Sequence, residues 1–142
     1  MEVIMKKITK ITAILAALLC ALVALCACSN YGSVRKAFEK AGYAEDQSIQ
    51  EYQGRYGDLL TEENEKGEKV TVATLHVLSK GLLGGTVVII EFQSTKKMQE
   101  KYNESATLQG LITDLQKSDY VNGACVLLLN LSNDGLEIFK NA

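Results

Sequence analysis

The chain has 142 residues, of which 15 are basic and 17 acidic, so its formal net charge at pH 7 is −2. Nucleic-acid binding needs a clustered basic surface, and this charge balance argues against that function. The sequence contains a single histidine, His76, which limits both catalysis and metal binding. We therefore expect no metal and no other cofactor.

The N-terminal segment combines the features of an export signal. Three lysines within residues 6–10 form a basic start, residues 11–25 form an apolar stretch, and Ala27 is a small residue directly before Cys28. Residues 25–28, Leu-Cys-Ala-Cys, resemble the lipobox of bacterial lipoproteins. The resemblance implies cleavage before Cys28, acyl chains such as palmitate on its sulfur, and a place at the extracytoplasmic face of the cell membrane.

Two other interpretations of this segment stay open. Residues 11–28 have about the minimum apolar length for a retained membrane helix, and a conventional signal cleaved without lipidation is the other alternative. Residues 1–4 include an acidic residue that an export signal does not need, so we expect translation to start at Met5. The predicted divisions are a signal peptide at 1–27, the lipidated cysteine and a short tether at 28–32, and one domain at 33–142.

The predicted mature chain contains one free cysteine and a mild excess of acid. Cys20 and Cys26 leave with the signal and Cys28 is acylated, so Cys125 has no partner for an internal disulfide. From residue 28 onward there are 12 basic and 16 acidic residues, a net charge of −4. This length is enough for one domain, which must be stabilised by its core alone.

The first half of the domain is predicted to contain one clear helix. Ser33 can cap a helix with apolar residues at helical spacing, and Gly42 ends it. Residues 45–68 are polar and carry a net charge of −6, with a short strand predicted at 49–53 and a helical turn at 58–65.

The second half is predicted to form a hairpin, helices and a final strand. Strands are expected at 70–78, 86–92 and 124–131, with a glycine-rich hairpin connection at 80–85. A helix or helix pair follows the capping residue Ser94, and a short helix closes the chain at 134–140. Residues 86–90 are almost continuously apolar, which is typical of a strand covered on both faces.

These elements predict an α+β fold after the signal segment. We expect a small antiparallel or mixed sheet of three to four strands, with helices packed on one face. A ferredoxin-like fold is the preferred architecture.

The candidate catalytic residues favour an ordinary structural role. A nucleophile and base pair of Cys125 with His76 is conceivable, but Cys125 lies in an apolar strand where a buried side chain is expected. The acidic turn beginning at Glu62 has a lysine where a calcium ligand should stand, so it predicts a solvated loop. We therefore predict no catalytic and no metal-binding residues.

An interaction surface is the remaining expectation. Tyr43, Tyr52 and Tyr56 lie in or beside the acidic segment, and tyrosine is enriched in binding surfaces. Leu82 and Leu83 lie at the hairpin tip, where core packing is the favoured expectation and contact with lipid or a partner is the alternative.

The predicted function is that of a non-enzymatic lipoprotein. It would bind an envelope protein or a small ligand at the membrane surface. The alternatives are an accessory lipoprotein of a transporter or envelope complex, and a small hydrolase or thiol enzyme.

Overall fold

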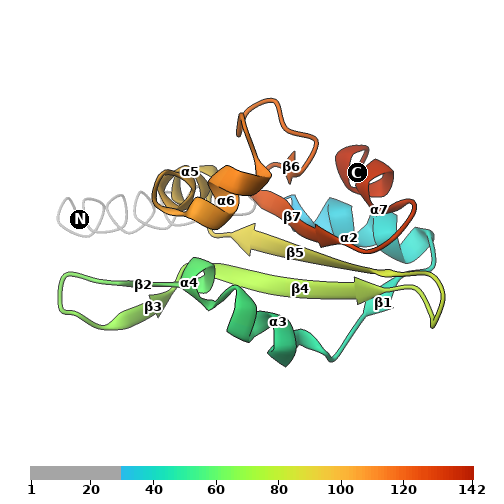
Figure 1. Ribbon diagram of the computed structural model, residues 1–142, viewed down its shortest axis with the longest axis horizontal. Coiled ribbons are helices and arrows are strands. Elements are labelled where there is room, and N and C mark those ends of the chain that lie inside the picture. The colour runs from blue at the N-terminus through green and yellow to red at the C-terminus, as the bar shows by residue number, and fades with distance from the viewer. Residues whose placement is uncertain (1–29) are drawn as a thin grey trace, which may run out of the picture.

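An antiparallel sheet lies at the centre of the computed structural model, which describes residues 30–142 (Figure 1). The strands are β1 (Ala44–Glu45), β2 (Thr61–Glu63), β3 (Lys69–Thr71), β4 (Ala73–Ser79), β5 (Thr86–Phe92), β6 (Val121–Asn122) and β7 (Cys125–Asn130). The helices are α2 (Tyr31–Lys40), α3 (Ile49–Arg55), α4 (Gly57–Leu60), α5 (Thr95–Glu104), α6 (Ala106–Leu111) and α7 (Gly135–Lys140). Five strands form the main sheet in the order β1-β4-β5-β7-β6, and β2 and β3 form a separate two-stranded sheet.

The β4–β5 hairpin is the most extensively paired part of the sheet. Seven residue pairs join its strands, from Ala73 opposite Phe92 to Ser79 opposite Thr86. β7 pairs with the other side of β5 and completes the middle of the sheet. The predicted α+β class and the three predicted strands are confirmed, although Val72 separates β3 from β4.

The sheet is larger than the predicted three to four strands. The additional members are β1 and β6, which have two residues each and lie at the two edges. Segments this short carry no periodicity of their own, so a sequence pattern cannot identify them.

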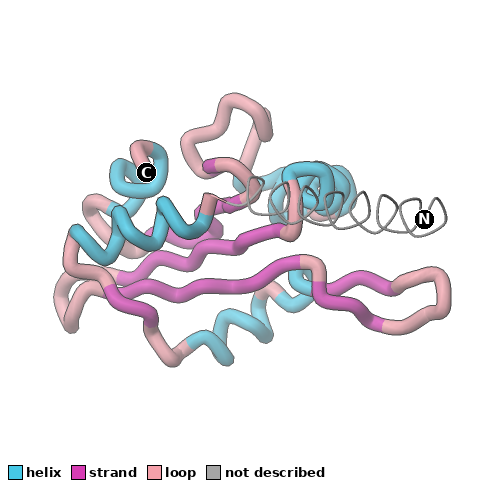
Figure 2. Tube along the Cα trace, turned by 180° about the vertical axis from the view of Figure 1, so that it is seen from behind, coloured by secondary structure: helices cyan, strands magenta, loops and turns pink. Residues whose placement is uncertain are grey.

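Helices cover both faces of the sheet, so the prediction of helices on one face is wrong. One core cluster joins α2 and α7 to Val87 and Ile89, and the other joins α3, α4, α5 and α6 to Val88 and Ile90 (Figures 1 and 2). Successive side chains of a strand point to opposite faces, and all four of these residues have an exposure of 0%. The apolar run of residues 86–90 therefore correctly predicted a strand covered on both faces, whereas the predicted architecture placed helices on one face only.

The strand predicted at 49–53 is also wrong, because these residues belong to helix α3. Ile49, Tyr52 and Tyr56 fall at helical spacing and pack against one face of the sheet. The helix forms because these apolar side chains recur at helical spacing over residues 49–56, a longer stretch than the predicted strand.

Two serine caps divide the segment after β5 into a helix pair. Ser94 Oγ accepts a hydrogen bond from the backbone N–H of Lys97 at 3.0 Å, and Ser105 Oγ accepts one from Leu108 at 3.2 Å. These caps start α5 and α6 separately. The predicted cap at Ser33 is wrong, because α2 already begins at Tyr31.

The predicted signal peptide at 1–27, the start at Met5 and the lipidation of Cys28 lie outside the described residues. Within residues 30–142, no helix combines the length and apolar character needed to cross a membrane.

Candidate functional site

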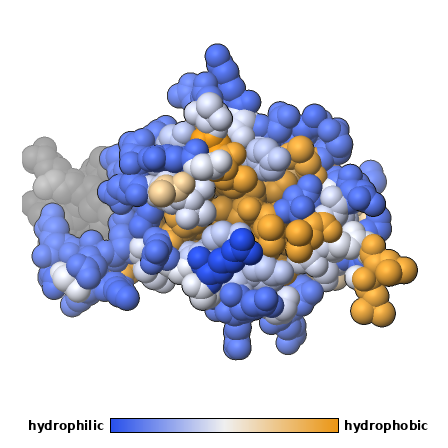
Figure 3. All heavy atoms as spheres, viewed as in Figure 1, coloured by the Kyte–Doolittle hydropathy of each residue, from blue (hydrophilic) through white to orange (hydrophobic). Residues whose placement is uncertain are grey.

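Two adjoining cavities form a groove on the sheet face that carries α3 to α6. The first has a volume of about 310 Å³ and the second about 420 Å³, and both are lined by Arg55, Tyr56 and Thr107. Figure 3 shows apolar residues gathered in the middle of this face, with hydrophilic residues around them. Each volume lies at the lower end of the range of small-molecule sites.

The two ends of the groove differ in chemistry. One end is lined by Leu111 and Leu128, which come from α6 and β7. The other end is lined by the exposed acidic residues Asp58 and Glu104 and by the basic residues Arg55 and Lys101. The groove can therefore hold an apolar group at one end and a charged group at the other.

Tyr56 lies between the two ends of the groove, because it lines both cavities. This side chain is only 6% exposed and belongs to the core cluster on this face. The guanidinium carbon of Arg55 lies 5.5 Å from the centre of the Tyr56 ring, within the range of a cation–π contact. Tyr56 is thus packed into the core and also contacted by Arg55.

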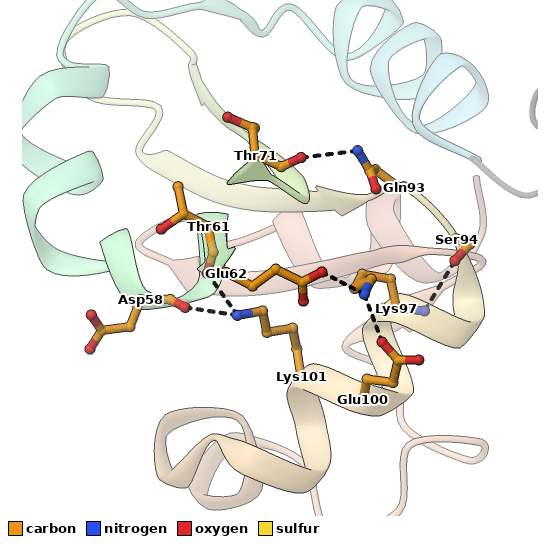
Figure 4. A network of polar contacts seen from close by, with 9 residues as sticks. All are labelled: Asp58, Thr61, Glu62, Thr71, Gln93, Ser94, Lys97, Glu100 and Lys101. Atoms are coloured by element: carbon orange, nitrogen blue, oxygen red, sulfur yellow. Dashed lines mark hydrogen bonds and ion pairs between the residues drawn. The ribbon is translucent and has the colours of Figure 1, made fainter. Parts of the chain in front are cut away.

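Two lysines of α5 fix the other wall to α4 and the β2–β3 hairpin (Figure 4). The Lys101 ammonium is buried and donates to the carbonyl oxygens of Asp58 at 3.3 Å and Thr61 at 2.8 Å. Lys97 Nζ lies 2.8 Å from carboxylate oxygens of both Glu62 and Glu100. The hydrogen bonds to these carboxylates raise the pKa of Lys97 above its usual value.

The structure separates the three predicted interaction tyrosines. Tyr56 lines the groove, and the half-buried Tyr52 packs against the same core cluster. Tyr43 is on the opposite face of the sheet, 2% exposed, with its hydroxyl donating to Asp134. Tyr43 is therefore not available as an interaction surface, because it is a core residue.

The hairpin leucines are fully exposed, so the favoured expectation of core packing is wrong. Leu82 and Leu83 have exposures of 104% and 101%. The predicted hairpin connection itself is confirmed, since Lys80 N–H donates to the carbonyl of Gly85 at 3.1 Å.

The Cys125 and His76 pair is separated by a strand. Cys125 is on β7 and His76 on β4, with β5 between them, so the two backbones are about 10 Å apart. Cys125 has an exposure of 0%, and burial together with the nearby Glu91 charge raises its pKa to about 12. The thiol is therefore protonated and inaccessible, which is the opposite of what a nucleophile requires.

His76 has a different partner, which the sequence analysis missed. Its Nε2 lies 3.1 Å from Glu91 Oε1, and its ring stacks on Tyr31 with the ring centres 3.5 Å apart. Glu91 is the one charged residue of the apolar strand β5, and this exception to the pattern could have pointed to a buried polar contact. The contact joins the start of α2 to the middle of the sheet.

The acidic turn after Glu62 is organised by its own side chains. Asn64 Oδ1 accepts hydrogen bonds from the backbone N–H groups of Lys66 at 2.9 Å and Glu68 at 3.0 Å. Among residues 30–142, the structure places no three or more His, Cys, Asp or Glu side chains together where they could hold a metal ion.

Comparison with known proteins adds no relative. No family model, curated protein or solved structure matches the chain.

Proposed function

We propose that this chain is a lipoprotein that is attached through Cys28 to the extracytoplasmic face of a cell membrane and binds a segment of an envelope protein. The support for the anchor is the order of basic start, apolar stretch and small residue before Cys28. The support for binding is the groove beside Tyr56, which is the single observation that carries the proposal. The domain acts by binding and not by catalysis.

The chemistry of the groove favours one kind of occupant. An apolar side chain fits over Leu111 and Leu128, and a lysine or arginine fits the end with Asp58 and Glu104. Two cations also line this end, but Arg55 lies over the Tyr56 ring and the Lys101 ammonium donates to backbone carbonyls, so Asp58 and Glu104 favour a basic segment. We therefore assign the groove to a protein segment in which apolar and basic residues adjoin.

An accessory role in a transporter or another envelope complex uses the same groove and the same occupant. A thiol enzyme is disfavoured, because burial keeps Cys125 protonated. For the fold, a ferredoxin-like relationship is retained as a proposal, and the antiparallel β4–β5 hairpin followed by helices and β7 supports it.

Photo-crosslinking in the producing cell tests the binding proposal. A photoreactive amino acid at Thr107 is expected to capture a discrete protein, and the same group at Lys66, on the β2–β3 turn, is not. Reversing both groove charges with Asp58→Lys and Glu104→Lys should abolish capture. The matched control is Glu63→Lys with Glu65→Lys, which changes the net charge equally at exposed positions outside the groove lining.

The captured segment must contain adjoining apolar and basic residues. An acidic segment, or capture that survives the charge reversal in the groove, overturns the assignment. The anchor has a separate test, since Cys28→Ser should leave an uncut and unlipidated precursor. Hydrolase activity that disappears in His76→Ala would contradict the non-enzymatic role.

A further inference from the structure

The exposed apolar side chains of the described residues gather at one end of the molecule. Leu82, Leu83 and Leu131 are the three large hydrophobic residues with high exposure in residues 30–142, at 104%, 101% and 60%. Leu131 adjoins the base of the β4–β5 loop, because its N–H donates to the carbonyl of Thr86 at 2.8 Å. An apolar group projects at this end of the molecule in Figure 3.

Glycines give the loop a shape that holds the two leucines outward. Gly81 and Gly85 have positive φ angles of 58° and 86°, which other residues rarely adopt. A Cβ on Gly84 would lie 1.9 Å from the carbonyl oxygen of Lys80, so the chain turns back tightly at this point. The loop is therefore closed at its base, and its leucines cannot fold back onto the sheet without rearranging it.

Lysines lie at the same end of the molecule. Lys36 and Lys40 are exposed on α2, and the chain leaving this helix passes Lys80, whose Nζ is 5.6 Å from the Tyr43 ring centre. Figure 2 shows the end of α2 and the β4–β5 loop at one end of the molecule and the β2–β3 hairpin at the other. The nearby carboxylates are engaged, with Asp134 accepting from Tyr43 and lying 3.6 Å from Lys80, and Asp46 accepting from Ser79.

The predicted anchor lies at the other end of the same helix. α2 begins at Tyr31, three residues after Cys28, and its ten residues span about 15 Å. A lipid on Cys28 therefore holds the start of α2 close to the bilayer, and the loop lies near its end. This position indicates a membrane surface as the partner of the leucines.

We infer that the β4–β5 loop inserts Leu82 and Leu83 into the bilayer that holds Cys28. The exposed basic residues Lys36 and Lys40 then face anionic headgroups. This inference rests on the proposed anchor and adds a second membrane contact to it. The contact fixes how the domain is oriented, so that the groove has a defined direction relative to the membrane.

Tryptophan fluorescence tests the insertion, since the chain has no tryptophan of its own. The full chain is produced in a bacterium, purified and incorporated into vesicles of phosphatidylglycerol and phosphatidylcholine, some with brominated acyl chains. In Leu83→Trp the emission should shift to shorter wavelength and be quenched by the brominated lipid. In the control Lys66→Trp, at the opposite end of the molecule, neither change is expected.

The charged residues are tested in the Leu83→Trp background. Lys36→Glu with Lys40→Glu should reduce the shift on vesicles that contain phosphatidylglycerol and leave it unchanged on phosphatidylcholine alone. An undiminished shift on the anionic vesicles overturns the role of the lysines. Leu82→Trp repeats the measurement at the neighbouring position, which is equally exposed.

Failure of the insertion and failure of the anchor give different results. If the chain sediments with vesicles and carries lipid on Cys28 by mass spectrometry, but Leu83→Trp emits as in water, the insertion alone is wrong. If the chain neither carries lipid nor sediments with vesicles, the anchor and the insertion are both wrong.

Discussion

The ammonium of Lys101 lies 2.8 Å from the carbonyl oxygen of Thr61, forty residues earlier in the chain. A second hydrogen bond, to the carbonyl of Asp58 in the first turn of α4, attaches the same ammonium to this helix. Lys101 is 8% exposed and is the one buried charged residue among residues 30–142. One side chain of α5 therefore satisfies two carbonyls of the opposite wall and holds the groove at its present width.

Removing this ammonium should destabilise the domain. We expect Lys101→Ala to lower the free energy of unfolding by about 2–3 kcal/mol, because two carbonyls lose a charged donor. Urea denaturation measures the change. Lys96→Ala, at an exposed position of the same helix, is the control and should change stability by less than about 0.5 kcal/mol. Equal effects of the two substitutions would contradict the role given to Lys101.

The buried thiol should be unreactive in the folded protein. With a pKa of about 12, roughly one Cys125 thiol in ten thousand is ionised at pH 8, before its burial is considered. Alkylation followed by mass spectrometry of the Cys125 peptide should show slow labelling in buffer and rapid labelling in denaturant. An introduced cysteine in Leu83→Cys should react rapidly in both. Rapid native labelling of Cys125 would reopen the thiol-enzyme alternative.

Acid should weaken the contact between Tyr43 and Asp134. The hydrogen bond from Tyr43 and the nearby Lys80 ammonium hold the pKa of Asp134 below its ordinary value of 3.8. The folded carboxylate therefore keeps its charge to lower pH than the unfolded one, and the stability it contributes is lost as the pH falls through the folded pKa. Tyr43→Phe should reduce the loss of stability between about pH 5 and pH 3 in urea titrations. Tyr120→Phe serves as the control, and an unchanged pH slope in Tyr43→Phe would refute the assignment.

Replacing two glycines by alanine should change the free energy of unfolding in opposite directions. Gly110 lies in helix α6 with open space around its Cα, so Gly110→Ala should raise the free energy of unfolding by about 0.5 kcal/mol through helix propensity. Gly84→Ala should lower it by about 1–3 kcal/mol, because the new methyl group meets the Lys80 carbonyl. Thermal unfolding of the two variants measures both signs. Stabilisation by Gly84→Ala would show that the loop tolerates a different backbone path.

The sequence alone predicted those strands whose own residues form a clear apolar run. Residues 86–92 and 125–130 are apolar over several consecutive positions, and β5 and β7 form there. The sequence did not predict α3, where few apolar residues are spread over a polar segment. It also did not predict β1 and β6, the two-residue strands at the sheet edges. The edge strands depend on neighbours that are distant in the chain, and two residues carry no pattern of their own. For α3, the spacing of Ile49, Tyr52 and Tyr56 shows the helix only over a longer stretch than the predicted strand.

The candidate site was predictable only in part. Tyr56 was among the expected interaction residues and lines the groove, but its neighbours Thr107, Leu111 and Leu128 come from α6 and β7. The groove exists because α6 and α3 flank the same strip of sheet, which is a tertiary relationship. The exposure of Leu83 could not be predicted either, since the choice between core and solvent is made by the turn geometry of three glycines.

The short edge strands have a consequence for proteins held at high density on a surface. β1 and β6 each have two residues, so each offers few backbone N–H and C=O groups to a strand from another molecule. β1 pairs only with Leu78 and Ser79 of β4, and β6 only with Cys125 and Val126 of β7, whereas the apolar strand β5 is enclosed between β4 and β7. Copies of the domain that collide in two dimensions therefore cannot pair with β5 from either edge of the sheet.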